Sequence, residues 1–162
     1  MRYDHTGLRI VAFKLFSTSF ADAAWIPALH SCEGANLAPA LEWSGEPPET
    51  RSFALIVEDP DAPAGIWCHW LLYDIGPKVH NLAQGFRAGG LGLSGANDFG
   101  KQGYGGPCPP KGHGPHRYFF KLYALDVHTL GLPAGVKRPE VLRAVKGHTL
   151  AEAQYMGRFE RK

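Results

Sequence analysis

The feature that most constrains the fold is a series of short, strand-like segments joined by turn-forming connections and not by helices. Residues 52–58, 67–75 and 116–126 are rich in β-branched and aromatic side chains, and residues 10–16 form a fourth such segment. The segment 52–58 is almost continuously apolar, which is typical of a strand buried on both faces. Parallel pairing needs long crossover connections, so these strands are expected to pair antiparallel. The sequence therefore predicts a mainly β fold.

The connections hold most of the turn-forming residues. Of the 162 residues, 20 are glycine and 13 are proline, which is well above average usage. They gather in 34–48, 59–65 and 85–114. A hydrophobic content of 44% still predicts a folded core, and the length fits one domain that spans residues 1–162.

Helical patterns occur mainly near the C-terminus. Pro139 stands at the first turn of one predicted helix, and Gly147 ends it. Thr149 and Glu152 have the spacing of a capping box, which predicts a second short helix. Residues 158–162 are then left as a final strand.

Charge and hydropathy exclude several classes of partner. Lys and Arg number 17 and Asp and Glu 15, a net charge of +2, with no long basic run. A protein that tracks the phosphates of a nucleic acid is expected to be more basic. No apolar run approaches the length of a membrane span, so at most peripheral membrane contact is expected. The N-terminus carries no apolar region typical of a signal peptide, which predicts a cytoplasmic location.

The three cysteines, Cys32, Cys68 and Cys108, are widely spaced. An odd number of cysteines without a C-x-x-C pair supports neither a disulfide framework nor a zinc site. The sequence therefore gives the cysteines no structural pairing.

Polar side chains occur where the predicted strands begin or end. Asp59 and Asp61 directly follow the apolar strand, and an ordinary Asx-Pro turn is an alternative explanation for them. His116 and Tyr118 are two residues apart at the start of a strand, so they share one face and offer two donors to an anion. His113 and His116 could also hold a metal with either carboxylate, since two histidines and a carboxylate form a known metal-binding set.

A further histidine lies inside the segment 67–75. On strict alternation, His69 shares one face of the strand with Trp67, Leu71 and Tyr73. A lone histidine on such a face is either a structural residue of the core or part of a site.

The glycine-rich segment 85–106 contains nine glycines and directly precedes Pro107 and Cys108. Successive glycines let backbone N–H groups approach and cradle an anion, whereas simple looseness is the competing explanation. Residues 90–95 match G-x-G-x-x-G in letters only, because no strand precedes them and no helix follows.

Four stretches in order resemble the phosphatidylethanolamine-binding proteins, also called Raf kinase inhibitor-like proteins, and their bacterial branch in particular. They are Asp59-Pro-Asp-Ala-Pro63, His69 on the next strand, Gly106-Pro-Cys-Pro-Pro-Lys-Gly112 and Gly114-Pro-His-Arg-Tyr118. The resemblance implies an antiparallel β-sandwich with short C-terminal helices. It also implies a small pocket for phosphate-like anions and phospholipid head groups. Carried over by motif, the pocket wall comprises Asp59, Asp61, Pro63, His69, Gly106, Pro107, Cys108, His116 and Tyr118.

The residues of this implied pocket have distinct expected roles. His69 and His116 donate to oxygens of the anion, and Tyr118 adds an O–H donor. Asp59 accepts a hydrogen bond from a histidine and fixes its tautomer. Asp61 does the same, or accepts from the ammonium of a head group.

The loop from Gly106 to Cys108 has two expected contributions. Its backbone N–H groups, apart from that of Pro107, face the anion. The Cys108 side chain narrows the pocket or offers a thiol.

Three functional hypotheses follow. The first is a cytoplasmic, non-enzymatic module that binds a phosphate-type ligand without cofactor or metal. The second is a hydrolase or metal-dependent enzyme that uses Asp59, Asp61, His69 and His116 as acid, base or ligands. The third is an interaction protein that regulates a kinase or a protease. A homodimer is a separate expectation, which does not depend on this third hypothesis. The resemblance implies no established reaction for the bacterial branch.

Overall fold

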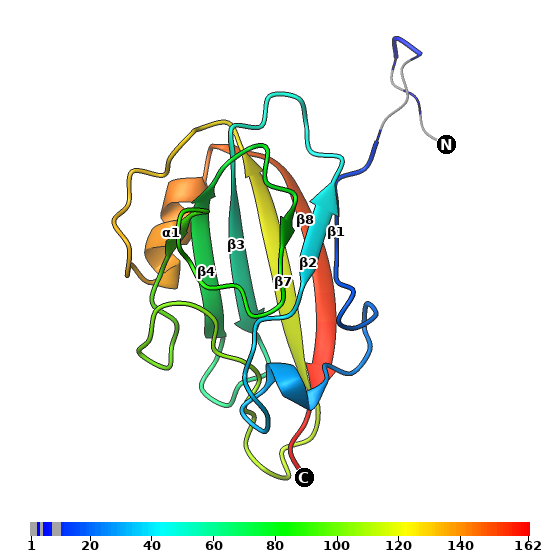
Figure 1. Ribbon diagram of the computed structural model, residues 1–162, viewed down its shortest axis with the longest axis vertical. Helices are drawn as coiled ribbons and strands as arrows, with labels where there is room; N and C mark the ends of the chain where they lie inside the picture. The colour runs from blue at the N-terminus through cyan, green and yellow to red at the C-terminus, as the bar shows by residue number, and fades with distance from the viewer. Residues whose placement is uncertain (1–2, 4, 8–10) are drawn as a thin grey trace.

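The computed structural model describes residues 3, 5–7 and 11–162, and within them two antiparallel sheets face each other (Figure 1). The smaller sheet has the strand order β1-β2-β5, and the larger has the order β6-β4-β3-β7-β8. This confirms the predicted antiparallel β-sandwich. The elements are β1 Lys14–Phe16, η1 Ala28–His30, β2 Leu41–Ser44, β3 Ser52–Asp59, β4 Trp67–Ile75, β5 Asn81–Leu82, β6 Leu93–Ser94, β7 His116–Leu125, α1 Arg138–Val145 and β8 Thr149–Phe159.

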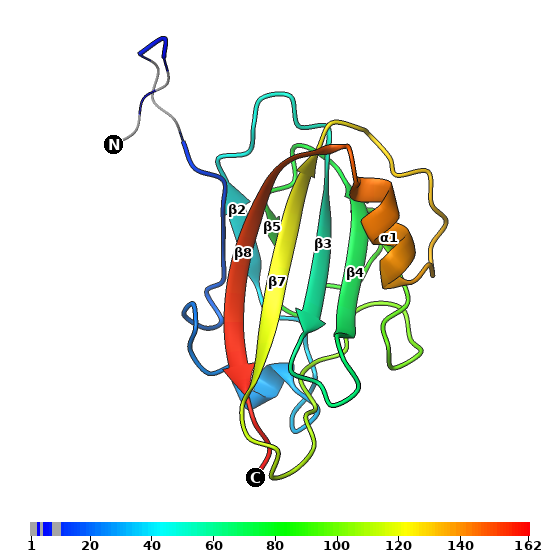
Figure 2. The ribbon, with the colours of Figure 1, turned by 180° about the vertical axis from the view of Figure 1, so that it is seen from behind.

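β3 lies at the centre of the larger sheet, and every one of its residues is buried. Leu55 and Val57 pack between the two sheets, whereas Ala54 and Ile56 pack on the opposite face. The helix α1 lies beside β4 on that opposite face (Figure 2), where its Val141 is fully buried. Burial from both sides explains the continuous apolar run in the sequence.

The C-terminal segment corrects the predicted second helix. α1 is confirmed, but residues from Thr149 onward form the strand β8, which pairs with β7 along its whole length and ends at Phe159. Ala153, Tyr155, Gly157 and Phe159 are buried in alternation, and this period of two is that of a strand. Long-range pairing with β7 therefore overrides the local capping-box spacing. No separate strand over 158–162 exists.

The first predicted strand is shorter than expected. β1 covers Lys14–Phe16, and residues 11–13 of the predicted segment 10–16 are not in a strand. Residue 10 lies outside the described residues. In the part of the chain that the structure describes, no helix is long and apolar enough to cross a membrane.

Candidate ligand-binding pocket

A β-bulge in β4 turns His69 toward the space between the sheets. Glu58 of β3 pairs with Cys68 and Val57 pairs with Trp70, so His69 is an extra residue in the ladder. Such a bulge re-aims side chains and interrupts their alternation. Of the predicted shared face, Trp67 and His69 do line the same pocket, whereas the placement of Leu71 and Tyr73 with them is wrong.

The two sides of the bulge face different layers. Leu71 and Tyr73 belong to the cluster beneath α1. The His69 ring instead contacts the ring of Tyr118 on β7, with 5.1 Å between ring centroids. The bulge thus places a histidine beside Tyr118 without moving the core residues that follow it.

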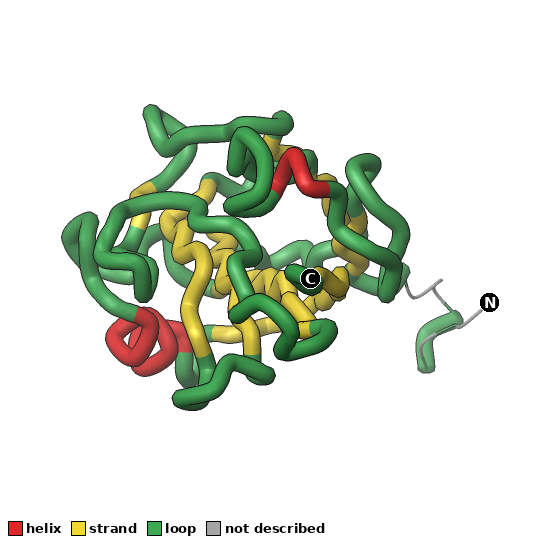
Figure 3. Tube along the Cα trace, turned by 90° about the horizontal axis from the view of Figure 1, so that it is seen from below, coloured by secondary structure: helices red, strands yellow, loops and turns green. Residues whose placement is uncertain are grey.

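The bulge opens onto a pocket of about 190 Å³ at one end of the sandwich. Because adjacent strands are antiparallel, β3 ends here while β4 and β7 begin here. Figure 3 views the molecule from this end, where connecting loops gather around the C-terminus. The lining residues are Asp59, Ala62, Pro63, Trp67, His69, Phe99, Cys108, Pro109, Pro110, His116 and Tyr118.

Six of the nine predicted site residues line this pocket, and three do not. Asp61, Gly106 and Pro107 are absent from the lining. Trp67 and Phe99 are lining residues that the sequence reasoning did not assign to the site. The position of Trp67, two residues before His69 at the start of a strand, is the signal that could have identified it.

Asp59, His116 and His113 form a chain of hydrogen bonds. Nδ1 of His116 lies 2.6 Å from Oδ2 of Asp59, and both side chains are almost fully buried. Nε2 of His116 lies 2.6 Å from Nδ1 of the exposed His113. Asp59 thus accepts from a histidine, as expected. Because the protein occupies both ring nitrogens of His116, this ring has no N–H left for an anion, contrary to the expected role.

Asp61 has neither of its expected roles. Its carboxylate accepts hydrogen bonds from the backbone N–H, Nε and Nη2 of Arg117, at 2.9, 2.9 and 2.8 Å. The Arg117 side chain is the main reason why the pKa of Asp61 falls from 3.8 to about 2. The carboxylate therefore holds the first residues of β7 in place from outside the pocket.

His69 is held as a neutral imidazole. Its Nδ1 lies 2.6 Å from the carbonyl oxygen of Gly105, which can only accept, so Nδ1 carries the proton. Burial lowers the pKa of His69 below 6.5, although the Gly105 carbonyl and the Asp59 carboxylate oppose this shift. Nε2 is then an acceptor in the unliganded pocket.

Two residues that line the pocket carry a buried donor without a partner. The hydroxyl of Tyr118 and Nε1 of Trp67 are inaccessible and make no hydrogen bond within the described residues. Burial raises the pKa of Tyr118, so its hydroxyl keeps its proton. Buried donors are rarely left unpaired in proteins, and each such group calls for an explanation.

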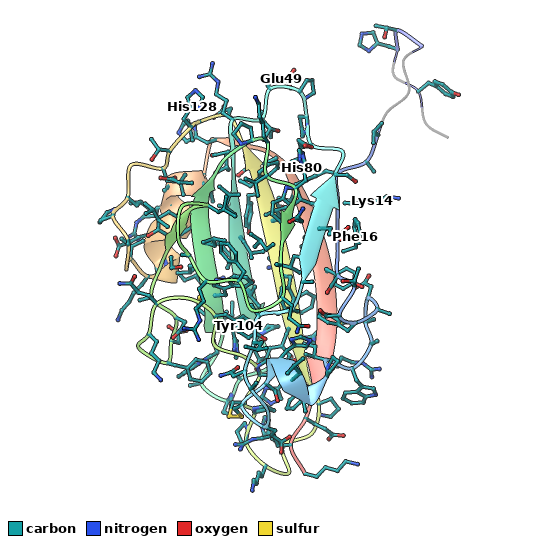
Figure 4. All side chains as sticks on the ribbon, viewed as in Figure 1. Lys14, Phe16, Glu49, His80, Tyr104 and His128 are labelled. Carbon is teal, nitrogen blue, oxygen red and sulfur yellow. A yellow bond between two sulfur atoms is a disulfide. The ribbon has the colours of Figure 1, made fainter. Side chains whose placement is uncertain are left out.

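A disulfide between Cys32 and Cys108 corrects the expectation that the cysteines are unpaired. The two Cα atoms lie 5.4 Å apart, and Cys68 remains as a buried free cysteine. Figure 4 shows the bond in yellow at the end of the molecule that carries η1 and the C-terminus. Cys108 thus offers no thiol to a ligand. Its partner lies 76 residues away in the sequence, and spacing alone does not reveal such a pairing.

The loop that precedes Cys108 is fastened to the segment after η1. The backbone N–H of Gly106 donates to Oδ1 of Asn36 at 2.8 Å, and that of Cys32 donates to the carbonyl of Pro107 at 3.1 Å. The expected donation from Gly106 to an anion is therefore wrong. Gly106 supports the wall from behind, where a Cβ atom would lie 2.1 Å from the carbonyl oxygen of His30.

The metal site considered from the sequence is not formed. Among the described residues, no group of three His, Cys, Asp or Glu side chains is arranged to hold a metal ion. His113 and His116 contact each other through ring nitrogens, and Arg117 binds Asp61.

Comparison with known proteins identifies the family. The family model described as phosphatidylethanolamine-binding protein matches residues 16–160. The chain belongs to the phosphatidylethanolamine-binding protein family. A UPF0098 protein of Aquifex aeolicus is 44% identical over 169 residues, which cover 96% of this chain and 98% of that protein.

Solved structures of phosphatidylethanolamine-binding proteins share the fold. A homologue from Chlamydia trachomatis is 41% identical with a TM-score of 0.86, covering 93% of this chain and 99% of that chain. Escherichia coli YbcL, described as a new member of the mammalian family, is 34% identical with a TM-score of 0.87 and the same coverage, 93% and 99%.

Membership in the phosphatidylethanolamine-binding protein family supports ligand binding in general. One relative from Mycobacterium tuberculosis, 44% identical over 144 residues, has the word lipoprotein in its name, LppC. The cytoplasmic location expected for this chain therefore stays a prediction.

Proposed function

We propose that this protein binds a small phosphate-type anion, either free or as the head group of a phospholipid, in the pocket between β3, β4 and β7. The single observation that carries this proposal is the pair of buried, unpartnered donors, Nε1 of Trp67 and the hydroxyl of Tyr118. A phosphate presents several acceptor oxygens close together, so it can accept from both donors at once.

The dimensions of the pocket support a small ligand. Its volume of about 190 Å³ is below the range of about 300–1,000 Å³ for sites of drug-sized ligands. A phosphate or an ethanolamine phosphate fits this volume, whereas acyl chains do not. Pro63, Pro109 and Pro110 make part of the wall apolar, and low polarity strengthens the hydrogen bonds that the donors make.

The proposal is of binding and not of catalysis. His116 is a fully buried acid–base candidate of the pocket, and its two ring nitrogens are bound to Asp59 and His113. A regulated kinase or protease would be a further step, for which the proposal names no surface. If the pocket bound such a protein partner without a ligand, the donors of Trp67 and Tyr118 would still need hydrogen-bond acceptors.

Isothermal titration calorimetry tests the proposal with two probes, inorganic phosphate and glycerophosphoethanolamine. Tyr118→Phe removes one donor and keeps the ring, so binding of either probe should weaken about tenfold or more, because a hydrogen bond to a charged group contributes about 1.5–3 kcal/mol. Tyr123→Phe, on the same strand but in the cluster beneath α1, is the matched control and should bind like the wild type.

The two probes separate the sources of the anion. Tighter binding of glycerophosphoethanolamine identifies a lipid head group, and equal binding identifies phosphate alone. The proposal is wrong if neither probe binds in a saturable way between about pH 5.5 and 8, or if Tyr118→Phe binds as tightly as the wild type.

A further inference from the structure

The arrangement of donors and acceptors fixes a proton balance for the pocket, and this inference rests on the proposed function. We infer that the pocket takes up its phosphate-type ligand together with one proton, which is held between Nε2 of His69 and an oxygen of the ligand. The pocket therefore selects a singly charged, protonated phosphate over a permanent dianion such as sulfate.

The orientation of His69 is the first step. The Nδ1–H of His69 donates to the Gly105 carbonyl at 2.6 Å, and the Gly105 N–H donates back to the His69 carbonyl at 2.9 Å. Rings on two sides, those of Phe99 and Tyr118, contact the imidazole edge-on. These contacts hold the ring in one orientation, in which Nδ1 is bonded to Gly105 and Nε2 is the ring nitrogen left for a ligand. A neutral imidazole presents a lone pair there.

The second step is a count of donors toward the ligand. Trp67 and Tyr118 each carry one buried donor without a partner, and the proposed function assigns one oxygen of a phosphate to each of them. His69 supplies an acceptor where a third oxygen would lie. Two lone pairs facing each other repel, and a single proton between them replaces that repulsion by a charge-assisted hydrogen bond.

The charged groups around His69 favour a single negative charge on the ligand. Asp59 faces His69 from β3, and Asp98 acts on it from the loop after β6. From β7 come Tyr118 and His116, whose ring nitrogens are already bonded. None of the described lining residues is a lysine or an arginine. A dianion would meet the carboxylate of Asp59 in the lining and no lysine or arginine there. Arg161, whose charge acts on Tyr118, donates its Nε–H to the carbonyl of Pro109 at 2.7 Å.

The number of protons in the complex is the same whether the ligand or His69 brings the proton. Either a protonated phosphate donates its P–O–H to Nε2, or an imidazolium donates its Nε2–H to a P–O⁻ oxygen. The complex therefore contains one proton more than a free dianion and a protein with a neutral His69 contain together. Burial disfavours the imidazolium in the empty pocket, so the proton arrives with the ligand.

Calorimetry of wild-type protein with inorganic phosphate measures this proton directly. At about pH 8, where free phosphate is mainly a dianion, titrations in buffers of different ionisation enthalpy should show uptake of about one proton per bound phosphate. The association constant should fall about tenfold for each pH unit above this value. At about pH 6.5, sulfate should bind at least about tenfold more weakly than phosphate.

Three variants locate the proton. His69→Gln puts a non-titrating amide in its place, so proton uptake at about pH 8 should fall toward zero. His113→Gln interrupts the hydrogen bonds that run from His113 through His116 to Asp59, and proton uptake should persist in this variant. His80→Gln should match the wild type. The side chain of His80 is exposed and contacts Glu46, far along the strands from the pocket.

The outcomes separate this inference from the proposed function. No phosphate binding at any pH overturns both. Phosphate binding without proton uptake, or uptake that is lost in His113→Gln and kept in His69→Gln, overturns this inference alone. If His69→Gln fails to fold, the wild-type proton count and the phosphate-to-sulfate ratio still decide it.

Discussion

Replacing both Cys32 and Cys108 with serine removes the cross-link between the pocket wall and the segment after η1. The disulfide closes a loop with a sequence separation of 76 residues. In the chain-entropy account, a loop of this size restricts the unfolded chain by about 4–5 kcal/mol at 25 °C. The folded state loses little, since Gly106 and Cys32 keep their hydrogen bonds across the same contact.

We therefore expect the double serine variant to lose about 4 kcal/mol of unfolding free energy. For a chain of this length, such a loss lowers Tm by on the order of 10 °C. Urea denaturation of the oxidised wild type, the reduced wild type and the variant measures it. The m-value should rise when the bond is absent, because the unfolded chain expands and exposes more surface.

A cysteine outside the bond provides the control. Cys68→Ala removes the buried free thiol, and in this variant the reductant should still lower the stability by the same amount. If the oxidised wild type and the double serine variant differ by less than about 1 kcal/mol, the entropic reasoning is refuted.

Two further predictions concern the surroundings of the pocket. In Gly106→Ala, the new Cβ would lie 2.1 Å from the His30 carbonyl oxygen, so thermal denaturation should show a loss of about 2 kcal/mol. Gly89→Ala should show no such loss, because its Cβ would meet only the Arg87 carbonyl oxygen, at an ordinary contact distance of 3.9 Å. In Asp61→Asn, the partly exposed pair with Arg117 is lost, at a cost of about 1 kcal/mol at neutral pH. Because the pKa of Asp61 is about 2 in the folded state and 3.8 otherwise, this contribution is complete above about pH 4 and disappears toward pH 2; an acid titration of stability that is identical in Asp61→Asn would contradict it.

Much of the fold could be predicted because its central strands carry strong local signals. The segment 52–58 is apolar on both faces, and the structure buries it on both faces. The segment from Thr149 could not be assigned locally, because the capping-box spacing and the period of two compete there. Only the ten-residue pairing with β7 decides between them.

The sequence allowed us to predict which strand ends form the site. It allowed less prediction of how the side chains are arranged there. Asp59, His69, His116 and Tyr118 do meet in one pocket. Which atoms remain free depends on neighbours that are distant in sequence, such as Gly105 for His69 and Arg117 for Asp61. The bulge at His69 depends on the relative register of β3 and β4, a property of two strands that neither strand shows alone.

The disulfide also bears on where the protein works. The cytoplasmic location is a prediction, and stable disulfides are typical of oxidising compartments. Measuring the thiols of protein isolated without reductant distinguishes the two. Three titratable thiols per chain indicate a reducing compartment, and one indicates an oxidising compartment.

The extra residue in β4 has a consequence for how such a pocket can arise. If His69 is removed from the sequence, Trp67, Cys68, Trp70 and Leu71 alternate regularly, and every core residue keeps its layer. Inserting one residue into a regular strand is thus enough to add a buried imidazole to a β-sandwich whose core stays the same. Deleting that residue is enough to remove the imidazole. In this strand, ligand chemistry and core packing can be inherited separately.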